Sequence, residues 1–275
     1  MRKAVVLGLC LLGFACAKSD GDADLSTRPN TDGGMGFGTD GGTPTPPPSG
    51  LVYGQSSTFL YRIDTASHAV SEVGFFAGCG HVSDIALDES STLYASNGVE
   101  LFIVENNTAR CTKVAAGTFP NSLSFVPAGT LDQSKETLVG YEGGSYVKID
   151  TASGATEKIG ELGGGFESSG DIVSVKDGKT FVTVKGPSCA DCLVEVDPKT
   201  GAMTKNWGSL GLVDVFGLAF WGGEIYAFTD SGEVALVKLA DDKLTVEKLS
   251  VPNAPSDLSF RGAGSTTSAP VGPVR

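Results

Sequence analysis

Histidine is scarce in this sequence, which contains only His68 and His81 among its 275 residues. Enzymes that rely on a metal ion or on a general base bring several His or Glu side chains together. Two histidines cannot form such a cluster. Their scarcity therefore counts against metal-dependent and acid–base catalysis.

Positive charge is also scarce, with 20 Lys and Arg residues against 32 Asp and Glu residues and a formal net charge of −12. No cluster of basic residues compensates for this balance. Binding to DNA or RNA depends on Lys and Arg contacts to phosphate groups. The composition excludes nucleic acid as a partner.

Long hydrophobic runs are lacking as well. The apolar stretch "AVVLGLCLLGFA" over residues 4–15 follows Arg2 and Lys3, and it is shorter than the roughly 20 residues that cross a bilayer. A basic start, a short apolar centre and a small residue at its end are typical of an export signal. We predict a signal peptide over residues 1–15.

The stretch "LLGFAC" resembles the lipobox of bacterial lipoproteins, although Gly13 stands where that family has a larger aliphatic residue. The resemblance implies that Cys16 is acylated and becomes the N-terminus, so that the membrane is contacted by a lipid anchor only. It also implies that Ala17 directs the protein to the outer membrane. The alternative is an ordinary secretory signal cut nearby, with the protein periplasmic or at the cell surface.

Residues 16–50 contain almost no aliphatic side chains and are rich in Gly, Asp, Thr and Pro. Such a composition cannot bury enough apolar surface to offset its ordering entropy. We predict a disordered linker that tethers the following domain.

The rest of the chain repeats one pattern five times, in which an apolar strand is followed by an acidic turn. The five copies are anchored on Ile63, Val104, Ile149, Val196 and Leu239. A second series, "SDIAL", "NSLSF", "GDIVS", "FGLAF" and "SDLSF", is anchored on Ile85, Leu123, Ile172, Leu218 and Leu258. Four short strands in each period of about 40–45 residues are typical of β-propeller blades.

We name the strands of a blade a, b, c and d from the axis outward, and the second series supplies strand a. The first copy lacks strand a, whereas the last copy consists of strand a alone. We therefore predict an all-β, five-bladed β-propeller of four-stranded antiparallel blades over residues 51–261. Residues 256–260 close the ring by pairing into the N-terminal blade, and residues 262–275 form a disordered tail.

The segments "IDTASGATEKIG" and "VDPKTGAM" resemble repeats of the NHL-like and YVTN-like propeller families of bacteria. The resemblance lies at the level of the repeat and implies a fold without a particular chemistry. The Asp residues of these turns, at positions 64, 150 and 197, suit the turn itself, since Asp accepts bonds from nearby backbone amides.

Candidate site residues stand just before the anchors of the a strands: Asp84, Ser122, Asp171, Gly217 and Asp257. Three carboxylates that converge on a channel repel one another unless they are protonated, spread apart or neutralised. Asp84, Asp171 and Asp257 are thus candidate ligands for Ca²⁺, which prefers oxygen ligands. The competing interpretation is that each Asp bonds to backbone amides of its own strand.

Four cysteines remain once Cys10 and Cys16 are assigned to the signal and the anchor. An even number in an exported chain favours disulfides. Cys189 and Cys192 lie in one hairpin, and Cys79 with Cys111 follows by elimination, although the strand order puts these two towards opposite ends of a blade. A redox dithiol and half a zinc site are the alternatives for "CADC".

Loops between successive blades each contain a phenylalanine, at positions 76, 119, 166 and 216. Repeated at one place in a ring, these side chains are expected to wedge between blades, or else to mark a binding face if they are exposed.

These observations predict a non-enzymatic binding or scaffold protein of the bacterial cell envelope, with an envelope protein or surface ligand as its partner. The alternative is a lyase- or hydrolase-type propeller enzyme that uses His81, Asp84, Asp171 and Asp257 at the channel mouth. Many functions share the propeller fold, so the fold itself names none of them.

Overall fold

The computed structural model describes residues 51–252 and 254–274. The chain divides into two units, residues 1–45 and 46–275, and all described residues belong to the second. The predicted signal peptide, Cys16 and the linker to residue 50 lie outside the described residues. Within the described range the structure contains twenty strands and no helix, so no helix there could cross a membrane.

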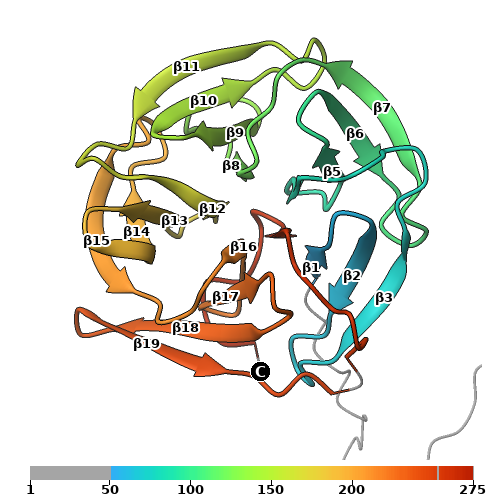
Figure 1. Cartoon of the computed structure of the whole chain (residues 1–275). Coiled ribbons are helices and arrows are strands. Elements are labelled where there is room, and N and C mark those ends of the chain that lie inside the picture. Colours follow the sequence, from blue (N-terminus) through green and yellow to red (C-terminus); the bar gives the residue numbers. More distant parts are fainter. Residues whose placement is uncertain (1–50, 253, 275) are drawn as a thin grey trace, which may run out of the picture. The chain divides into compact units, whose positions relative to one another are not determined.

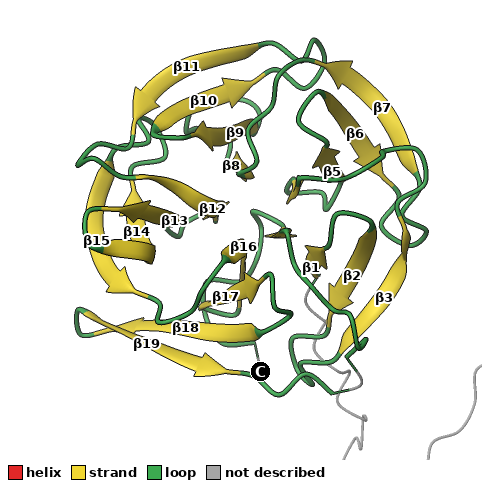
Figure 2. Cartoon of the chain, in the orientation of Figure 1, coloured by secondary structure: helices red, strands yellow, loops and turns green. Residues whose placement is uncertain are grey.

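The strands form five four-stranded antiparallel sheets arranged as blades around one axis (Figures 1 and 2). In the order a, b, c, d, blade 1 contains β20 (Gly262–Ser265), β1 (Val52–Gln55), β2 (Phe59–Ile63) and β3 (Val70–Phe75). In the same order, blade 2 contains β4 (Asp84–Leu87), β5 (Leu93–Ser96), β6 (Glu100–Val104) and β7 (Cys111–Ala116). Blade 3 contains β8 (Leu123–Val126), β9 (Thr137–Glu142), β10 (Ser145–Ile149) and β11 (Thr156–Glu161).

Blade 4 contains β12 (Glu167–Ser174), β13 (Thr180–Gly186), β14 (Cys189–Val196) and β15 (Met203–Ser209). Blade 5 contains β16 (Val215–Trp221), β17 (Glu224–Thr229), β18 (Val234–Ala240) and β19 (Lys243–Lys248). The predicted fold class, five antiparallel blades closed by the C-terminal end of the chain, is confirmed. Because antiparallel strands alternate in direction, the b–c and d–a connections share one face, which we call the upper face. The a–b and c–d connections lie on the lower face.

The acidic c–d turns have the structural role that their sequence predicts. Oδ1 of Asp64 and of Asp150 accepts hydrogen bonds from the backbone amides two and three residues further along the chain. These bonds lower the pKa of both carboxyls. Gly154 and Gly201 end their turns with φ of 75° and 67°, a conformation that glycine adopts without strain.

The closing strand differs from the prediction. β20, at residues 262–265, pairs with β1 from Val52↔Ser265 to Gln55↔Gly262, whereas residues 256–260 form no strand. The reason is the space at the axis. A Cβ on Gly262 would lie 2.0 Å from Asp84 Oδ1, and one on Gly264 would lie 2.9 Å from Leu87 Cδ1. Only a sequence as small as "GAGS" fits there.

The segment that was predicted to close the ring still contributes to the core. Phe260 is fully buried, and its ring packs edge-on against Tyr61 and Phe228 at centroid distances of 5.9 and 5.0 Å. Leu258 is partly buried against the same cluster. The approach is close, because a Cβ on Gly54 would lie 2.7 Å from the Phe260 ring.

The prediction that residues 262–275 form a disordered tail is wrong. After β20 the chain crosses the lower face, where Thr266 Oγ1 donates to the Asp88 carbonyl at 2.8 Å and the Lys176 amide donates to the Thr267 carbonyl at 2.8 Å. Thr267 also bonds to Glu136, and Val271 lies over Gly178 and Gly223. The tail therefore contacts the a–b turns of blades 2 to 5 around the lower end of the channel.

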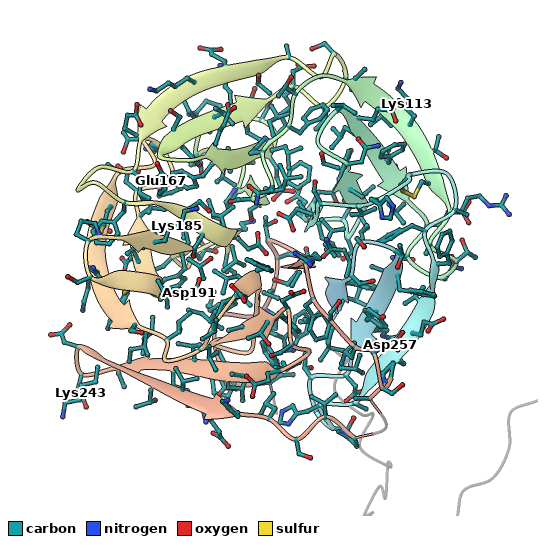
Figure 3. All side chains as sticks on the ribbon, in the orientation of Figure 1. Lys113, Glu167, Lys185, Asp191, Lys243 and Asp257 are labelled. Carbon is teal, nitrogen blue, oxygen red and sulfur yellow. A yellow bond between two sulfur atoms is a disulfide. The ribbon has the colours of Figure 1, made fainter. Side chains whose placement is uncertain are left out.

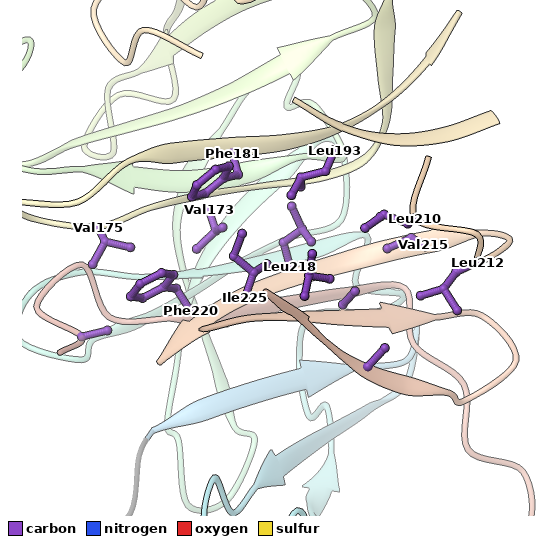
Figure 4. Packing of buried hydrophobic residues seen from close by; sticks show 14 residues of the cluster. Val173, Val175, Phe181, Leu193, Leu210, Leu212, Val215, Leu218, Phe220 and Ile225 are labelled. Atoms are coloured by element: carbon purple, nitrogen blue, oxygen red, sulfur yellow. The ribbon is translucent and has the colours of Figure 1, made fainter. Parts of the chain in front are cut away.

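The hydrophobic core lies between the blades. The cluster between blades 4 and 5 illustrates it (Figure 4), with Val173, Phe181 and Leu193 on one side and Leu218, Phe220 and Ile225 on the other. Facing sheets bury side chains from both surfaces in this way, so each blade depends on its neighbours.

Removal of residues 262–275 tests the closure. A chain that ends at Arg261 loses β20, so that β1 loses its partner on the axial side and Asp171 Oδ2 loses the Ala263 amide, which costs about 3 kcal/mol or more. We expect the melting temperature, followed by circular dichroism, to fall by roughly 6 °C or more.

A chain that ends at Pro270 is the matched control, because it keeps β20 and the buried residues Thr266, Thr267 and Ala269. It should melt much closer to the full chain. Equal melting of the chain that ends at Arg261 and the full chain would show that residues 262–265 do not close the ring.

Candidate axial site

Each blade places one residue at the same position near the upper end of its a strand: Asp84, Ser122, Asp171, Gly217 and Gly262. We call these five residues the axial ring. Asp84, Ser122 and Asp171 are each fully buried. The structure thus brings together two of the three predicted carboxylates, together with the predicted positions of Ser122 and Gly217.

Asp171 joins three blades. Its Oδ1 accepts a hydrogen bond from its own neighbour, the Ile172 amide, at 2.7 Å. Its Oδ2 accepts from the Leu218 amide of blade 5 at 2.8 Å and from the Ala263 amide of blade 1 at 3.4 Å. Both of its oxygens are therefore occupied by backbone donors.

Asp84 joins two further blades to this network. Its Oδ2 accepts from the Leu123 amide of blade 3 at 2.6 Å. The carboxyl also interacts directly with that of Asp171, and the two share a hydrogen bond. Two carboxyl groups can form such a bond only when one carries a proton. The pair thus contacts backbone or side-chain groups of all five blades.

Burial and proximity set the electrostatics of the pair. Desolvation raises the pKa of both carboxyls well above the usual range, and the charge of Asp171 raises the pKa of Asp84 further. The backbone amides act in the opposite direction and favour the charged form of Asp171. We therefore assign the shared proton to Asp84 and the charge to Asp171.

Gln55, at the end of β1, completes the polar centre and was missed by the sequence reasoning. It is fully buried, and neither atom of its amide has a hydrogen-bond partner among the described residues. The same holds for Asp84 Oδ1 and Ser122 Oγ. The only sequence signal is a Gln at the end of an otherwise apolar b strand, where the other b strands carry Ser, Glu, Gly or Thr.

Asp257 does not belong to the ring. It is exposed on the segment between β19 and β20, beside Tyr61 of blade 1, and Figure 3 shows it at the periphery of the molecule. The ring position that the prediction gave to Asp257 belongs to Gly262, because the closing strand begins later in the chain. His81 is also exposed, in the loop between blades 1 and 2.

A pocket of about 300 Å³ opens above the axial ring on the upper face. Its walls come from all five blades: Ser57, Val82, Ser83, Asn121, Gly170, Phe216 and Arg261. Arg261 lies 5.5 Å from the Phe216 ring and forms an ion pair with Asp230 at 3.2 Å. Ser83, Asn121, Gly170, Phe216 and Arg261 each directly precede a ring residue, so the pocket is the mouth of the channel.

The loop phenylalanines divide into two groups. Phe76 and Phe119 are buried between blades, which confirms the wedge prediction for them. Phe166 is half-buried against the cluster between blades 3 and 4, and Phe216 lines the mouth of the channel.

Both predicted disulfides are present, Cys79–Cys111 and Cys189–Cys192. The strand order puts Cys79 and Cys111 towards opposite ends of a blade, yet they form a disulfide. The reason is that the outer strands run around the ring (Figure 1), which brings the loop after β3 beside β7. Disulfides are typical of proteins outside the cytoplasm. A redox function for Cys189 and Cys192 stays a prediction.

No group of three His, Cys, Asp or Glu side chains that could hold a metal ion occurs among the described residues. The described residues therefore contain no metal site made of His, Cys, Asp and Glu side chains alone. The polar centre instead combines two carboxyls with an amide and a hydroxyl.

The fold and the axial ring define a five-bladed β-propeller with a polar channel. The sequence matches no protein-family model and no curated protein. Among solved structures, a symmetrical protein studied for its de novo evolutionary emergence matches with a TM-score of 0.50 and 15% identity, over 80% of this chain and 99% of that one.

A chain of the nidogen/laminin complex matches with a TM-score of 0.48 and 10% identity, over 80% of this chain and 87% of that one. A gluconolactonase from Xanthomonas campestris matches with a TM-score of 0.47 and 18% identity, over 80% and 78%. The likeness to the symmetrical protein, with its TM-score of 0.50 and 15% identity, shows the fold alone.

The carboxyl pair predicts a pH dependence of stability. The folded state keeps a proton on the pair that the unfolded chain releases above the ordinary carboxyl pKa. The free energy of unfolding should therefore fall as pH rises from that ordinary pKa through the raised pKa of the folded state. Asp84→Asn should remove this decrease, because its amide donates to Asp171 at every pH.

Melting temperatures of the two proteins, measured in chelator-containing buffer from acid to alkaline pH, test this. Asp150→Asn is a control in which stability should depend on pH in the opposite direction. The pKa of Asp150 is lowered in the folded protein, so the stabilisation that this carboxyl provides is lost as pH falls. An unchanged pH slope in the Asp84→Asn protein would contradict the shared proton.

Proposed function

We propose that the protein is a non-enzymatic binding protein of the bacterial cell envelope, whose propeller offers its upper face to an envelope protein or surface ligand. The observation that carries this proposal is the contrast between the centre and the upper face. The carboxyls of the centre are buried and bonded to backbone amides, whereas the upper face carries a pocket and exposed apolar side chains.

Three of the most exposed large apolar side chains lie at connections of the upper face. Phe75 ends β3, Val99 lies in the b–c hairpin of blade 2, and Val213 lies in the loop between blades 4 and 5. Their exposed fractions are 58%, 61% and 72%. Apolar side chains that remain exposed together with a polar pocket are typical of interaction surfaces.

The mouth of the channel suits a polar group of the partner. Arg261, Asn121, Ser57 and Ser83 offer hydrogen-bond donors and acceptors, and Phe216 provides an apolar wall. A larger hollow of about 590 Å³ lies on the lower face, but its walls come from blades 3 and 4 alone. A pocket that all five blades build is held in place by the whole ring.

The alternative function, catalysis at the channel mouth, has less support. Asp84 and Asp171 are buried below the mouth, while His81 and Asp257 are exposed at other places. A general acid or base must come within hydrogen-bond reach of its substrate. The four candidate residues do not form one accessible group.

The predicted export signal and lipid anchor, together with the disulfides, support a position outside the cytoplasm. In this proposal residues 16–50 tether the propeller to the outer membrane. The binding face then acts at a distance from the lipid surface.

Crosslinking in intact cells tests the binding face. We expect the combined change Phe75→Ser, Val99→Ser and Val213→Ser to reduce crosslinked partner by about tenfold or more, because a few side chains carry most of the energy of an interface. The matched control replaces exposed lower-face residues, with Asn106→Ser, Asn107→Ser and Lys199→Ser. Equal crosslinking of both variants would contradict the assignment, and both should melt like the original protein.

The anchor has its own test. Intact mass of membrane-extracted protein should show an acyl group on a chain that begins at Cys16. Cys16→Ser should release the protein from the membrane fraction, whereas Cys10→Ser should not. Protein of unmodified mass in the membrane fraction would refute the lipid anchor.

A further inference from the structure

Unpartnered polar atoms gather beside the axial ring. Gln55 Oε1 and Nε2, Asp84 Oδ1 and Ser122 Oγ are all buried and have no hydrogen-bond partner within the described part of the chain. A buried polar group without a partner costs about 1–3 kcal/mol. Four such atoms on residues of one polar centre indicate a bound species that satisfies them.

Gly262 shows that these side chains converge. A Cβ at this residue would lie 2.0 Å from Asp84 Oδ1 and 2.8 Å from Gln55 Oε1. Both oxygens are thus directed at the same space from different blades. Ser122 occupies the equivalent ring position on blade 3, and the amide of its neighbour Leu123 donates to Asp84.

Access to this space comes from the upper face. The pocket at the channel mouth lies directly above the ring, since its wall residues Ser83, Asn121 and Arg261 directly precede Asp84, Ser122 and Gly262. The tail that follows β20 surrounds the lower end of the channel, and Thr266 and Thr267 of this tail are buried. A small solute therefore reaches the ring through the mouth.

The chemistry of the gathered atoms is that of hard oxygen ligands. Three of the four atoms are oxygens, one of them from a carboxyl that lies against a second carboxyl. Adjacent buried carboxyls repel unless a proton or a cation neutralises them. Carboxylate, amide and hydroxyl oxygens in an irregular arrangement suit Ca²⁺, whereas Mg²⁺ demands a near-octahedral site.

We propose that a calcium ion binds beneath the channel mouth, with Asp84 Oδ1, Gln55 Oε1 and Ser122 Oγ as its protein ligands. Water that enters through the mouth completes the coordination. The ion takes the place of the proton that Asp84 holds in its absence, while Asp171 stays bonded to the backbone amides of its neighbours and adds negative charge from behind Asp84. This site differs from the predicted one, because Gln55 and Ser122 replace Asp257, and it does not depend on the identity of the partner.

Titration of the chelated protein with CaCl₂ in mildly alkaline buffer tests the site. We expect saturable heat in isothermal calorimetry and a rise in melting temperature of roughly 5 °C or more at saturation. MgCl₂ and NaCl at matched ionic strength should produce a smaller rise. Native mass spectrometry should show one bound calcium ion per chain.

Two variants tie the effect to these residues. Asp84→Asn keeps an acceptor for the Leu123 amide and should weaken calcium binding at least tenfold. Gln55→Met retains the volume of the side chain without its oxygen and should also weaken binding. Gln55→Glu, which restores an oxygen ligand, should bind at least as well as the original protein.

Asp150→Asn in a lower-face turn is the control and should bind calcium normally. The absence of heat and of any melting shift with calcium would overturn the proposal and leave ordered water between these atoms. Unchanged binding by both the Asp84→Asn and the Gln55→Met proteins would also overturn it, by placing the ion elsewhere.

Discussion

The open inner edge of five strands, which meet around one narrow axis, is the constraint on which the rest of the structure depends. An a strand pairs with strand b on one side only, so amides on its other edge lack a partner in the sheet. The Leu123, Leu218 and Ala263 amides are in this position, and the carboxyls of Asp84 and Asp171 accept their hydrogen bonds. Two side chains thus satisfy backbone donors from three blades.

This solution limits what the centre of the molecule can do. Carboxyl oxygens that hold the blades together are not available to a substrate, and in the absence of a bound cation a shared proton keeps the buried pair from carrying two charges. Recognition of a partner then depends on the loops of the upper face. The axial ring holds these loops in place whatever their sequence. Scaffolds with a rigid centre and variable loops are common for binding functions.

Much of the fold could be predicted from the sequence, because blade number and strand order depend on a pattern that recurs in every copy. The sequence predicts the pairing of Cys79 with Cys111 by elimination alone. The twist that brings these cysteines together is a property of whole sheets, so a short segment of sequence does not reveal it. Asp84 and Asp171 were found as candidates because they stand at one position of the repeat. Gln55 was not, because its partners come from other blades and no spacing in the sequence relates them.

The closing strand shows most clearly where pattern and space diverge. "SDLSF" matches the other a strands, and "GAGS" has no β-branched or aromatic residue, so strand propensity favours the wrong segment. Spacing does not decide between them either, since both follow Leu218 at a distance within the range of the other copies. Space does decide, because the last strand must enter between β16 and β4, where a Cβ on Gly217 would already lie 2.8 Å from Ala263. Phe260 would not fit at the axis, and it packs instead against Tyr61 and Phe228. The stretch "SDLSF", although it is the one most typical of a strand, therefore contributes to the hydrophobic core just before the strand that closes the ring.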